Sequence, residues 1–274
     1  MLLSDAVRRA ALFPLCDWLP RPAGHPDRLL TVAGVLVQLP DGLPMAGVFP
    51  ERLEESRVHQ VVNEVRRFLH EEEQLAQGTW FVPEEAFPPG LGDRLRTLGM
   101  RPSDQPGLEP RGAAMVAVRA PQPAPTDVVV RRVDTLDDYL AAQLVTADVF
   151  EMDDEFRQAF VGRAQRLWEV EHTFGLVATF VALIDGEVVA SARAYFGQTA
   201  VFLTGGGTRP DARGRGAYRA LVRARWDAAA ERGTPALTVG AGEMSRPILE
   251  RLGFTIVGWY DCLLDDLASA SGLP

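Results

Sequence analysis

The stretch Leu203–Gly216, with the sequence LTGGGTRPDARGRG, decides the fold that the sequence predicts. Apolar residues lead into three glycines, a proline ends the strand pattern, and residues 215–232 then have helical spacing. Glycines let backbone N–H groups approach a ligand closely, and a helix start adds unpaired N–H donors and a positive dipole end. The turn Arg213–Gly216, between a strand and a helix, is therefore typical of a diphosphate-binding site.

The charges around this turn also indicate an anion site. Residues 205–225 hold six arginines and one acid, which leaves a local charge of +5 in a chain of net charge −9. The overall acidity argues against a nucleic-acid-binding protein, because phosphate contacts need a basic face. All 28 basic residues are arginine, which excludes chemistry that needs a lysine amine. A glycine-rich hairpin followed by a solvated, arginine-rich helix face is the alternative interpretation.

A proline-rich segment, APQPAP at residues 120–125, divides the chain. Three alternating prolines cannot continue a helix or a central strand, so the segment reads as a stiff, extended linker. We predict a first domain at residues 1–120, a linker at 121–127 and a second domain at 128–274. Both domains have ordinary sizes.

The second half predicts a mixed sheet with helices on both faces. We expect strands near residues 128–133, 178–184, 188–196, 199–204, 236–239 and 254–264, and helices near 136–149, 154–168, 215–232 and 245–252.

The first half partly repeats the second. We expect a helical run at residues 53–73, a strand at 79–82, a short helix ending on Leu98-Gly99-Met100 and a strand at 113–118. The second half has a similar helix end at Leu252-Gly253-Phe254. An internal duplication and a coincidence between two common α/β patterns both remain open.

The segment Thr208–Gly216 resembles the central motif of the GNAT family of N-acetyltransferases, a strand ending in x-x-Pro followed by Arg/Gln-x-x-Gly-x-Gly/Ala. The element order over residues 128–266, with a strand–helix–Gly-Phe segment at 237–254, also follows the family. The resemblance implies an α/β (α+β) fold, the acyl-CoA N-acyltransferase fold, with a mixed, mostly antiparallel sheet flanked by helices. It further implies a tandem of two such domains, the first degenerate and without the Arg-x-x-Gly turn.

The same resemblance implies acetyl-CoA as co-substrate and no metal. A bulge at Gly205–Gly207 is expected to splay the strand from its neighbour and to admit the acyl-pantetheine arm. The turn and the helix start are expected to wrap the diphosphate. The residues assigned to the cofactor are Gly206, Gly207, Thr208, Arg213, Gly214, Arg215, Gly216, Ala217, Tyr218 and Arg219.

Two positions depart from the family pattern. The last motif position, usually Gly or Ala, is Tyr218. Leu249 stands where many members have a tyrosine that protonates the leaving thiolate, so this acid is absent or another residue supplies it. Candidates for moving the proton are Glu151, Asp153, Asp154, Glu155, Glu243 and Tyr260. Acids in loops are also often only solvated, and Asp153 and Asp154 are good helix caps.

We therefore predict an acyl-CoA-dependent N-acetyltransferase that acts on a primary amine of a small molecule or peptide. The acidic loop at residues 151–155 favours a cationic acceptor. Leu249 favours the alternative of a non-catalytic acyl-CoA-binding sensor or assembly module. In a third interpretation, the first half forms part of the acceptor pocket.

The remaining expectations concern partners and location. Two distant cysteines and four scattered histidines give no metal-ligand spacing. The sequence has no signal-peptide pattern and no long apolar run. We expect a cytoplasmic monomer or homodimer that binds neither membrane nor nucleic acid.

Overall fold

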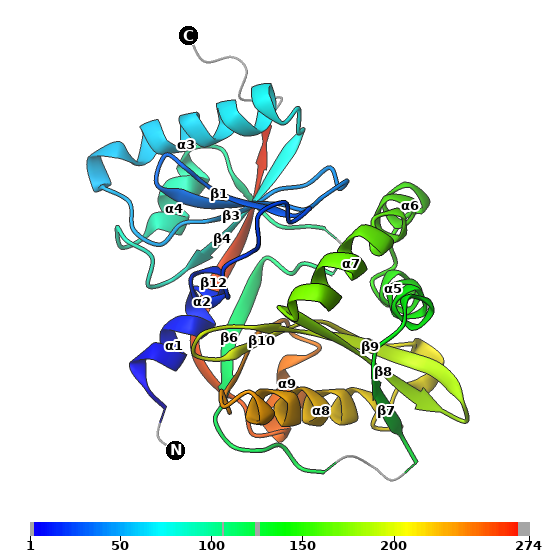
Figure 1. The fold of residues 1–274 in the computed structure, drawn as a ribbon. Coiled ribbons are helices and arrows are strands. Elements are labelled where there is room, and N and C mark those ends of the chain that lie inside the picture. The colour runs from blue at the N-terminus through cyan, green and yellow to red at the C-terminus, as the bar shows by residue number, and fades with distance from the viewer. Residues whose placement is uncertain (1–2, 106, 124–126, 268–274) are drawn as a thin grey trace. The chain divides into compact units, whose positions relative to one another are not determined.

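The computed structural model describes residues 3–105, 107–123 and 127–267 (Figure 1). Contacts divide the chain into two compact units: unit 1 comprises residues 1–25 and 114–257, and unit 2 comprises residues 26–113 and 258–274. Neither unit is a continuous stretch, because the strands β6 (Arg111–Ala117) and β12 (Thr255–Asp266) each pass from one unit to the other. Within the described ranges, no helix is long and apolar enough to cross a membrane.

Unit 1 is a mixed, mostly antiparallel sheet with helices on both faces, as predicted (Figure 1). Strands β7 to β10 are antiparallel neighbours, β11 pairs parallel with β10, and β6 lies beside β11. Helices α5 and α7 cover one face and α8 covers the other. Its elements are α1 (Asp5–Leu12), α2 (Pro14–Asp17), β7 (Val129–Arg132), α5 (Leu136–Val149), α6 (Asp154–Gly162), α7 (Ala164–Phe174), β8 (Val177–Ile184), β9 (Glu187–Phe196), β10 (Val201–Thr208), a 3-10 turn (Pro210–Ala212), α8 (Ala217–Glu231), β11 (Leu237–Ala241) and α9 (Arg246–Arg251).

Two predicted elements of unit 1 differ from the structure. The single helix expected at 154–168 is wrong in extent, because α6 ends at Gly162 and α7 continues to Phe174, with Arg163 between them. The strand expected at 199–204 continues to Thr208, since pairing with β9 carries it through the glycines.

The N-terminal segment belongs to unit 1. The Asp17 carboxylate accepts hydrogen bonds from the backbone N–H groups of Thr199 and Ala200, at 3.0 and 3.1 Å. Trp18 stacks on Tyr195 of β9 with ring centroids 4.5 Å apart. These contacts join residues distant in sequence, which the linker-based division had placed in different domains.

Unit 2 has a smaller sheet. Strands β1, β2 and β3 are antiparallel, β4 pairs parallel with β3, and β12 pairs antiparallel with β4. Buried side chains of α3, α4 and β4 share one apolar core. The elements are β1 (Arg28–Val32), β2 (Val35–Leu39), β3 (Gly47–Phe49), a 3-10 turn (Glu55–Arg57), α3 (Val58–Arg67), a π-helical turn (Phe68–Glu72), β4 (Gln77–Pro83), α4 (Leu91–Thr97) and β5 (Arg101–Pro102).

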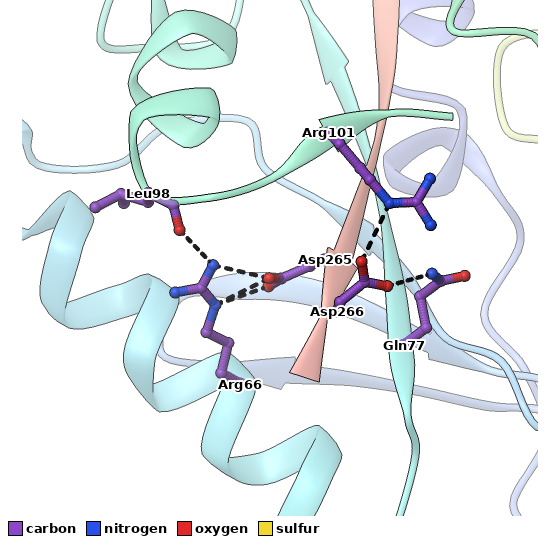
Figure 2. A network of polar contacts seen from close by, with 6 residues as sticks. All are labelled: Arg66, Gln77, Leu98, Arg101, Asp265 and Asp266. Atoms are coloured by element: carbon purple, nitrogen blue, oxygen red, sulfur yellow. Dashed lines mark hydrogen bonds and ion pairs between the residues drawn. The ribbon is translucent and has the colours of Figure 1, made fainter. Parts of the chain in front are cut away.

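A polar network holds β12 in unit 2 (Figure 2). Arg66 of α3 donates three hydrogen bonds of 2.8–3.0 Å to the buried Asp265 carboxylate and a fourth to the Leu98 carbonyl. The adjacent Asp266 accepts from Gln77 and Arg101, and these hydrogen bonds lower the pKa of its carboxyl group. The end of β12 is thereby fixed by charge as well as by strand pairing.

The two units repeat one order of elements. Each has three antiparallel strands, a helix and a strand parallel to the third: β8-β9-β10-α8-β11 in unit 1 and β1-β2-β3-α3-β4 in unit 2. A short helix follows in each, α9 or α4. This shared order favours internal duplication over coincidence.

Each unit completes its sheet with a strand from the other half of the sequence. Beside the parallel strand lies β6 in unit 1 and β12 in unit 2. The contact-based units therefore differ from the domains predicted at 1–120 and 128–274, whose boundaries stay a prediction. Within the predicted linker at 121–127, residues 124–126 lie outside the described residues.

Candidate functional site

Strand β10 carries a β-bulge at its glycines. Thr204 pairs with Arg193, whereas Gly207, three residues further on, pairs with Ser191, only two residues away on β9. Gly205 has a φ of +58°, a conformation that favours glycine strongly. The bulge expected from the sequence is confirmed.

The bulge coincides with a separation of two strands. Pairing between β10 and β11 covers Val201–Leu203 and Leu237–Val239. Beyond this register β10 continues to Thr208 and β11 to Ala241. The last five residues of β10 thus follow β9 and leave β11, as the family resemblance implied.

Neighbouring helices pack closely against two of the bulge glycines, Gly207 most tightly. A Cβ atom on Gly207 would lie 2.2 Å from Cγ1 of Val149, on α5. A Cβ atom on Gly206 would lie 3.2 Å from Cε2 of Tyr218, on α8. The two glycines thus face opposite helical layers, and close helix–strand packing explains both.

The glycine turn leads directly into α8. Gly214 and Gly216 have φ values of +80° and +88°. Gly216 is the N-cap of α8 and makes no side-chain cap hydrogen bond, so a ligand can accept from the first-turn N–H groups. Arg213 is exposed, and its Nε donates to the Thr208 carbonyl at 3.3 Å. The turn therefore presents backbone donors and a tethered guanidinium group together.

The local charge is lower than the sequence count suggests. Two acids that lie outside residues 205–225 pair with arginines inside this segment. Asp185 lies in a hairpin turn, and Asp227 lies one turn further along α8. The ion pairs are Arg215–Asp185, Arg223–Asp227 and, within the segment, Arg209–Asp211, with shortest N–O distances of 3.1, 2.9 and 2.8 Å. These exposed pairs are individually weak and leave a basic surface at the turn.

A buried polar cluster beside the bulge was missed by sequence reasoning. Arg193 of β9 is ion-paired with Glu171 of α7, which is 4% exposed. Glu171 also accepts a hydrogen bond of 3.0 Å from the Tyr139 hydroxyl, and burial raises the pKa of this phenol. An arginine inside the apolar strand β9 was the one available signal, because the partner carboxylate lies 22 residues away.

The residues proposed for proton transfer lie in different surroundings. Leu249 has no exposed surface and belongs to the core of unit 1. Tyr260 is in unit 2, where burial raises the pKa of its phenol. Glu151 and Glu243 are exposed in unit 1, at the end of α5 and after β11. The roles of Glu151, Glu243 and Tyr260 in proton transfer stay predictions.

The acidic loop is partly explained by helix capping. The Asp153 carboxylate accepts from the backbone N–H of Phe156 at 2.8 Å and caps α6, as anticipated. Glu151, Asp154 and Glu155 are exposed. Among the described residues, no group of three His, Cys, Asp or Glu could hold a metal ion.

A sequence model of the Acetyltransferase (GNAT) family matches residues 142–254. This part of the chain, from within α5 to just after α9, is therefore a GNAT domain, and it contains both the bulge and the turn. The GNAT family uses acetyl-CoA, so the family and fold support acyl transfer from acetyl-CoA in general. No curated protein matched the sequence.

Solved structures share the fold over both units. A GCN5-related N-acetyltransferase from Kribbella flavida has a TM-score of 0.68 at 18% identity, covering 94% of this chain and 95% of that chain. A tandem GNAT protein from the clavulanic acid biosynthesis pathway has a TM-score of 0.59 at 16% identity, covering 85% and 78%. A GCN5-related N-acetyltransferase from Sphaerobacter thermophilus has a TM-score of 0.62 at 14% identity, covering 85% and 76%. These likenesses confirm the predicted fold, including its tandem form.

Proposed function

We propose that this chain transfers an acetyl (acyl) group from acetyl-CoA to a primary amine of a small molecule or peptide. One continuous path of backbone carries the proposal. Strand β10 leaves β11 after Leu203, bulges at Gly205, and runs through Arg213–Gly216 into a helix start without a side-chain cap. The match of residues 142–254 to the GNAT family supports the same function.

In this proposal the cofactor follows the path in two parts. The acyl-pantetheine arm lies along Gly206, Gly207 and Thr208, where β10 does not pair with β11. The diphosphate lies at Arg213–Arg219, where helix N–H groups and arginine side chains supply donors. Nε of Arg219 is buried and, among the described residues, has no hydrogen-bond partner, so a phosphate oxygen would satisfy it.

The chemistry is direct attack of the amine on the thioester carbonyl. In this proposal, backbone N–H groups of the bulge stabilise the oxyanion that forms. Leu249 cannot protonate the departing thiolate, so this proton comes from solvent or from an exposed acid such as Glu151 or Glu243.

A cationic acceptor fits the acidic segment at residues 151–155, which includes the first turn of α6. Three exposed carboxylates remain there after Asp153 is used for capping: Glu151, Asp154 and Glu155. Attraction to these groups would favour a polyamine, an aminoglycoside or another multiply charged amine.

The burial of Leu249 favours a second candidate function, acyl-CoA binding without turnover. The test is CoA release from acetyl-CoA with a panel of polyamines, aminoglycosides and amine-bearing peptides. We expect amine-dependent release, with the KM for acetyl-CoA raised about tenfold or more in Arg213→Glu. Arg131→Glu, the same charge change on exposed β7, should stay within about twofold. Tight binding of acetyl-CoA without amine-dependent release across the panel would instead support the sensor.

A further inference from the structure

Arg225 is a buried arginine directly beneath the bulge. It lies on α8, and 1% of its surface is exposed. A Cβ atom on Gly206 would lie 3.5 Å from Nη2 and 3.6 Å from Nη1 of Arg225. The guanidinium group therefore lies at van der Waals distance from the position where a side chain at residue 206 would begin.

The hydrogen bonds of Arg225 connect α8 to the strand beside the bulge. Its Nε donates to the Leu221 carbonyl at 3.1 Å, and Nη1 donates to the Arg193 carbonyl at 3.3 Å. Arg193 pairs with Thr204, at the last position before the register slips. Arg225 thus supports the β9 backbone at the position where the bulge interrupts the ladder.

The charge of Arg225 has no carboxylate partner among the groups that act on it. Burial lowers the pKa of Arg225 to about 10, and a charge interaction and a hydrogen bond, both with the phenol of Tyr218, partly offset this effect. The group stays protonated at neutral pH. Its Nη2 is buried and has no hydrogen-bond partner in the described part of the chain.

Arg193 provides the contrast on the other face of the sheet. Its Cδ lies 3.9 Å from the position of a Cβ atom on Gly205, and its charge is neutralised by Glu171. The bulge therefore has an arginine on each face, and among the described residues Arg193 is ion-paired with a carboxylate whereas Arg225 is not. Burying a cation without a neighbouring carboxylate costs free energy. Negative charge that develops on the substrate during the reaction would offset part of this cost.

We propose that Arg225 is a positioning residue that holds the bulge in shape and stabilises negative charge developing on the thioester oxygen at the bulge N–H groups. This inference rests on the proposed function. The amine nitrogen bonds to the thioester carbon, and the carbonyl π electrons move to oxygen. The carbon–sulfur bond then breaks as the carbonyl reforms, the amine loses a proton to solvent, and the thiolate takes one from solvent or from an exposed acid. Arg225 exchanges no proton and acts through the bulge backbone and its fixed charge.

The experiment compares Arg225→Met, which removes the charge, with Arg225→Lys, which keeps it. Arg223→Met, at a half-buried arginine two residues earlier on the same helix that pairs with Asp227, is the matched control. We expect kcat to fall roughly 10- to 100-fold in Arg225→Met, with the KM for acetyl-CoA changed less than about threefold. In Arg225→Lys, which keeps the charge, we expect kcat to fall only about 3- to 10-fold. Parallel loss of kcat and acetyl-CoA affinity without rescue by lysine would overturn the inference.

Amide hydrogen exchange over residues 203–208 separates this inference from the proposed function, because it needs no turnover. Faster exchange in Arg225→Met than in wild type and Arg223→Met supports a positioning role even if no amine is acetylated. Equal exchange in all three proteins overturns that role even if the wild type is an active transferase. Should Arg225→Met fail to fold, Arg225→Lys serves in both measurements, because it loses the planar guanidinium group that joins the Leu221 and Arg193 carbonyls while keeping the charge.

Discussion

Replacing Gly207 by alanine should destabilise unit 1 and damage the bulge. The new Cβ would lie 2.2 Å from Cγ1 and 3.1 Å from Cβ of Val149. Carbon atoms in contact are ordinarily about 3.5–4.0 Å apart, so the closer overlap exceeds about 1 Å. Such overpacking costs about 1–3 kcal/mol, which lowers the Tm of a domain of this size by about 2–12 °C. Thermal unfolding followed by circular dichroism measures the shift.

Two control variants test whether the contact with Val149 is what requires glycine at position 207. Gly162→Ala, on α6, adds a methyl group with no atom within 4 Å and should leave the Tm unchanged or slightly raised. Val149→Ala removes both methyl groups that face Gly207, so Gly207→Ala should cost less in that background, by about 0.5 kcal/mol or more. An unchanged Tm in Gly207→Ala, or an equal cost in both backgrounds, would show that the contact with Val149 does not fix the glycine.

Three further predictions concern buried groups. Leu249→Tyr should lower the free energy of unfolding by about 1–3 kcal/mol, and with it the Tm, because the site has no exposed surface and the hydroxyl would enter the core. This variant should not raise kcat. A gain in kcat would show that an acid can work from this position. Burial raises the pKa of the Cys262 thiol to about 12, so a thiol reagent at pH 8 should modify one cysteine per folded chain, the exposed Cys16, and two in guanidinium chloride; two rapid equivalents in the native protein would contradict the burial. Asp265→Ala should cost about 3–5 kcal/mol in denaturant unfolding, because it leaves the Arg66 guanidinium largely buried without its carboxylate, and Arg66→Met should restore part of this loss in the double variant.

The site elements governed by local rules were predictable from the sequence. The family resemblance predicted the bulge at the glycine run, and the run permits it because glycine adopts the positive φ of Gly205 without steric cost. The start of α8 followed from the two glycines of the turn, and Asp153 was recognised as a cap from its place before an apolar helix.

Features that depend on distant contacts were not predictable in this way. Nothing local indicates that Asp17 anchors the β9–β10 turn, or that Asp185 meets Arg215. The sequence also does not indicate that β6 completes the sheet of unit 1 and β12 the sheet of unit 2, because the choice of a distant pairing partner leaves no periodicity in the sequence. Arg225 was counted only as one basic residue among six, and its burial became visible when α8 was placed on the sheet.

Calorimetric binding of two ligands tests the central claim, a CoA diphosphate site at Arg213–Gly216. Acetyl-CoA carries the diphosphate, and S-acetylpantetheine has the same acyl arm without it. We predict that wild type binds acetyl-CoA at least about 100-fold more tightly than S-acetylpantetheine, and that Arg213→Glu removes most of this difference while leaving the affinity for S-acetylpantetheine unchanged. Equal affinity of the wild type for both ligands, or an unchanged preference in Arg213→Glu, would contradict the account.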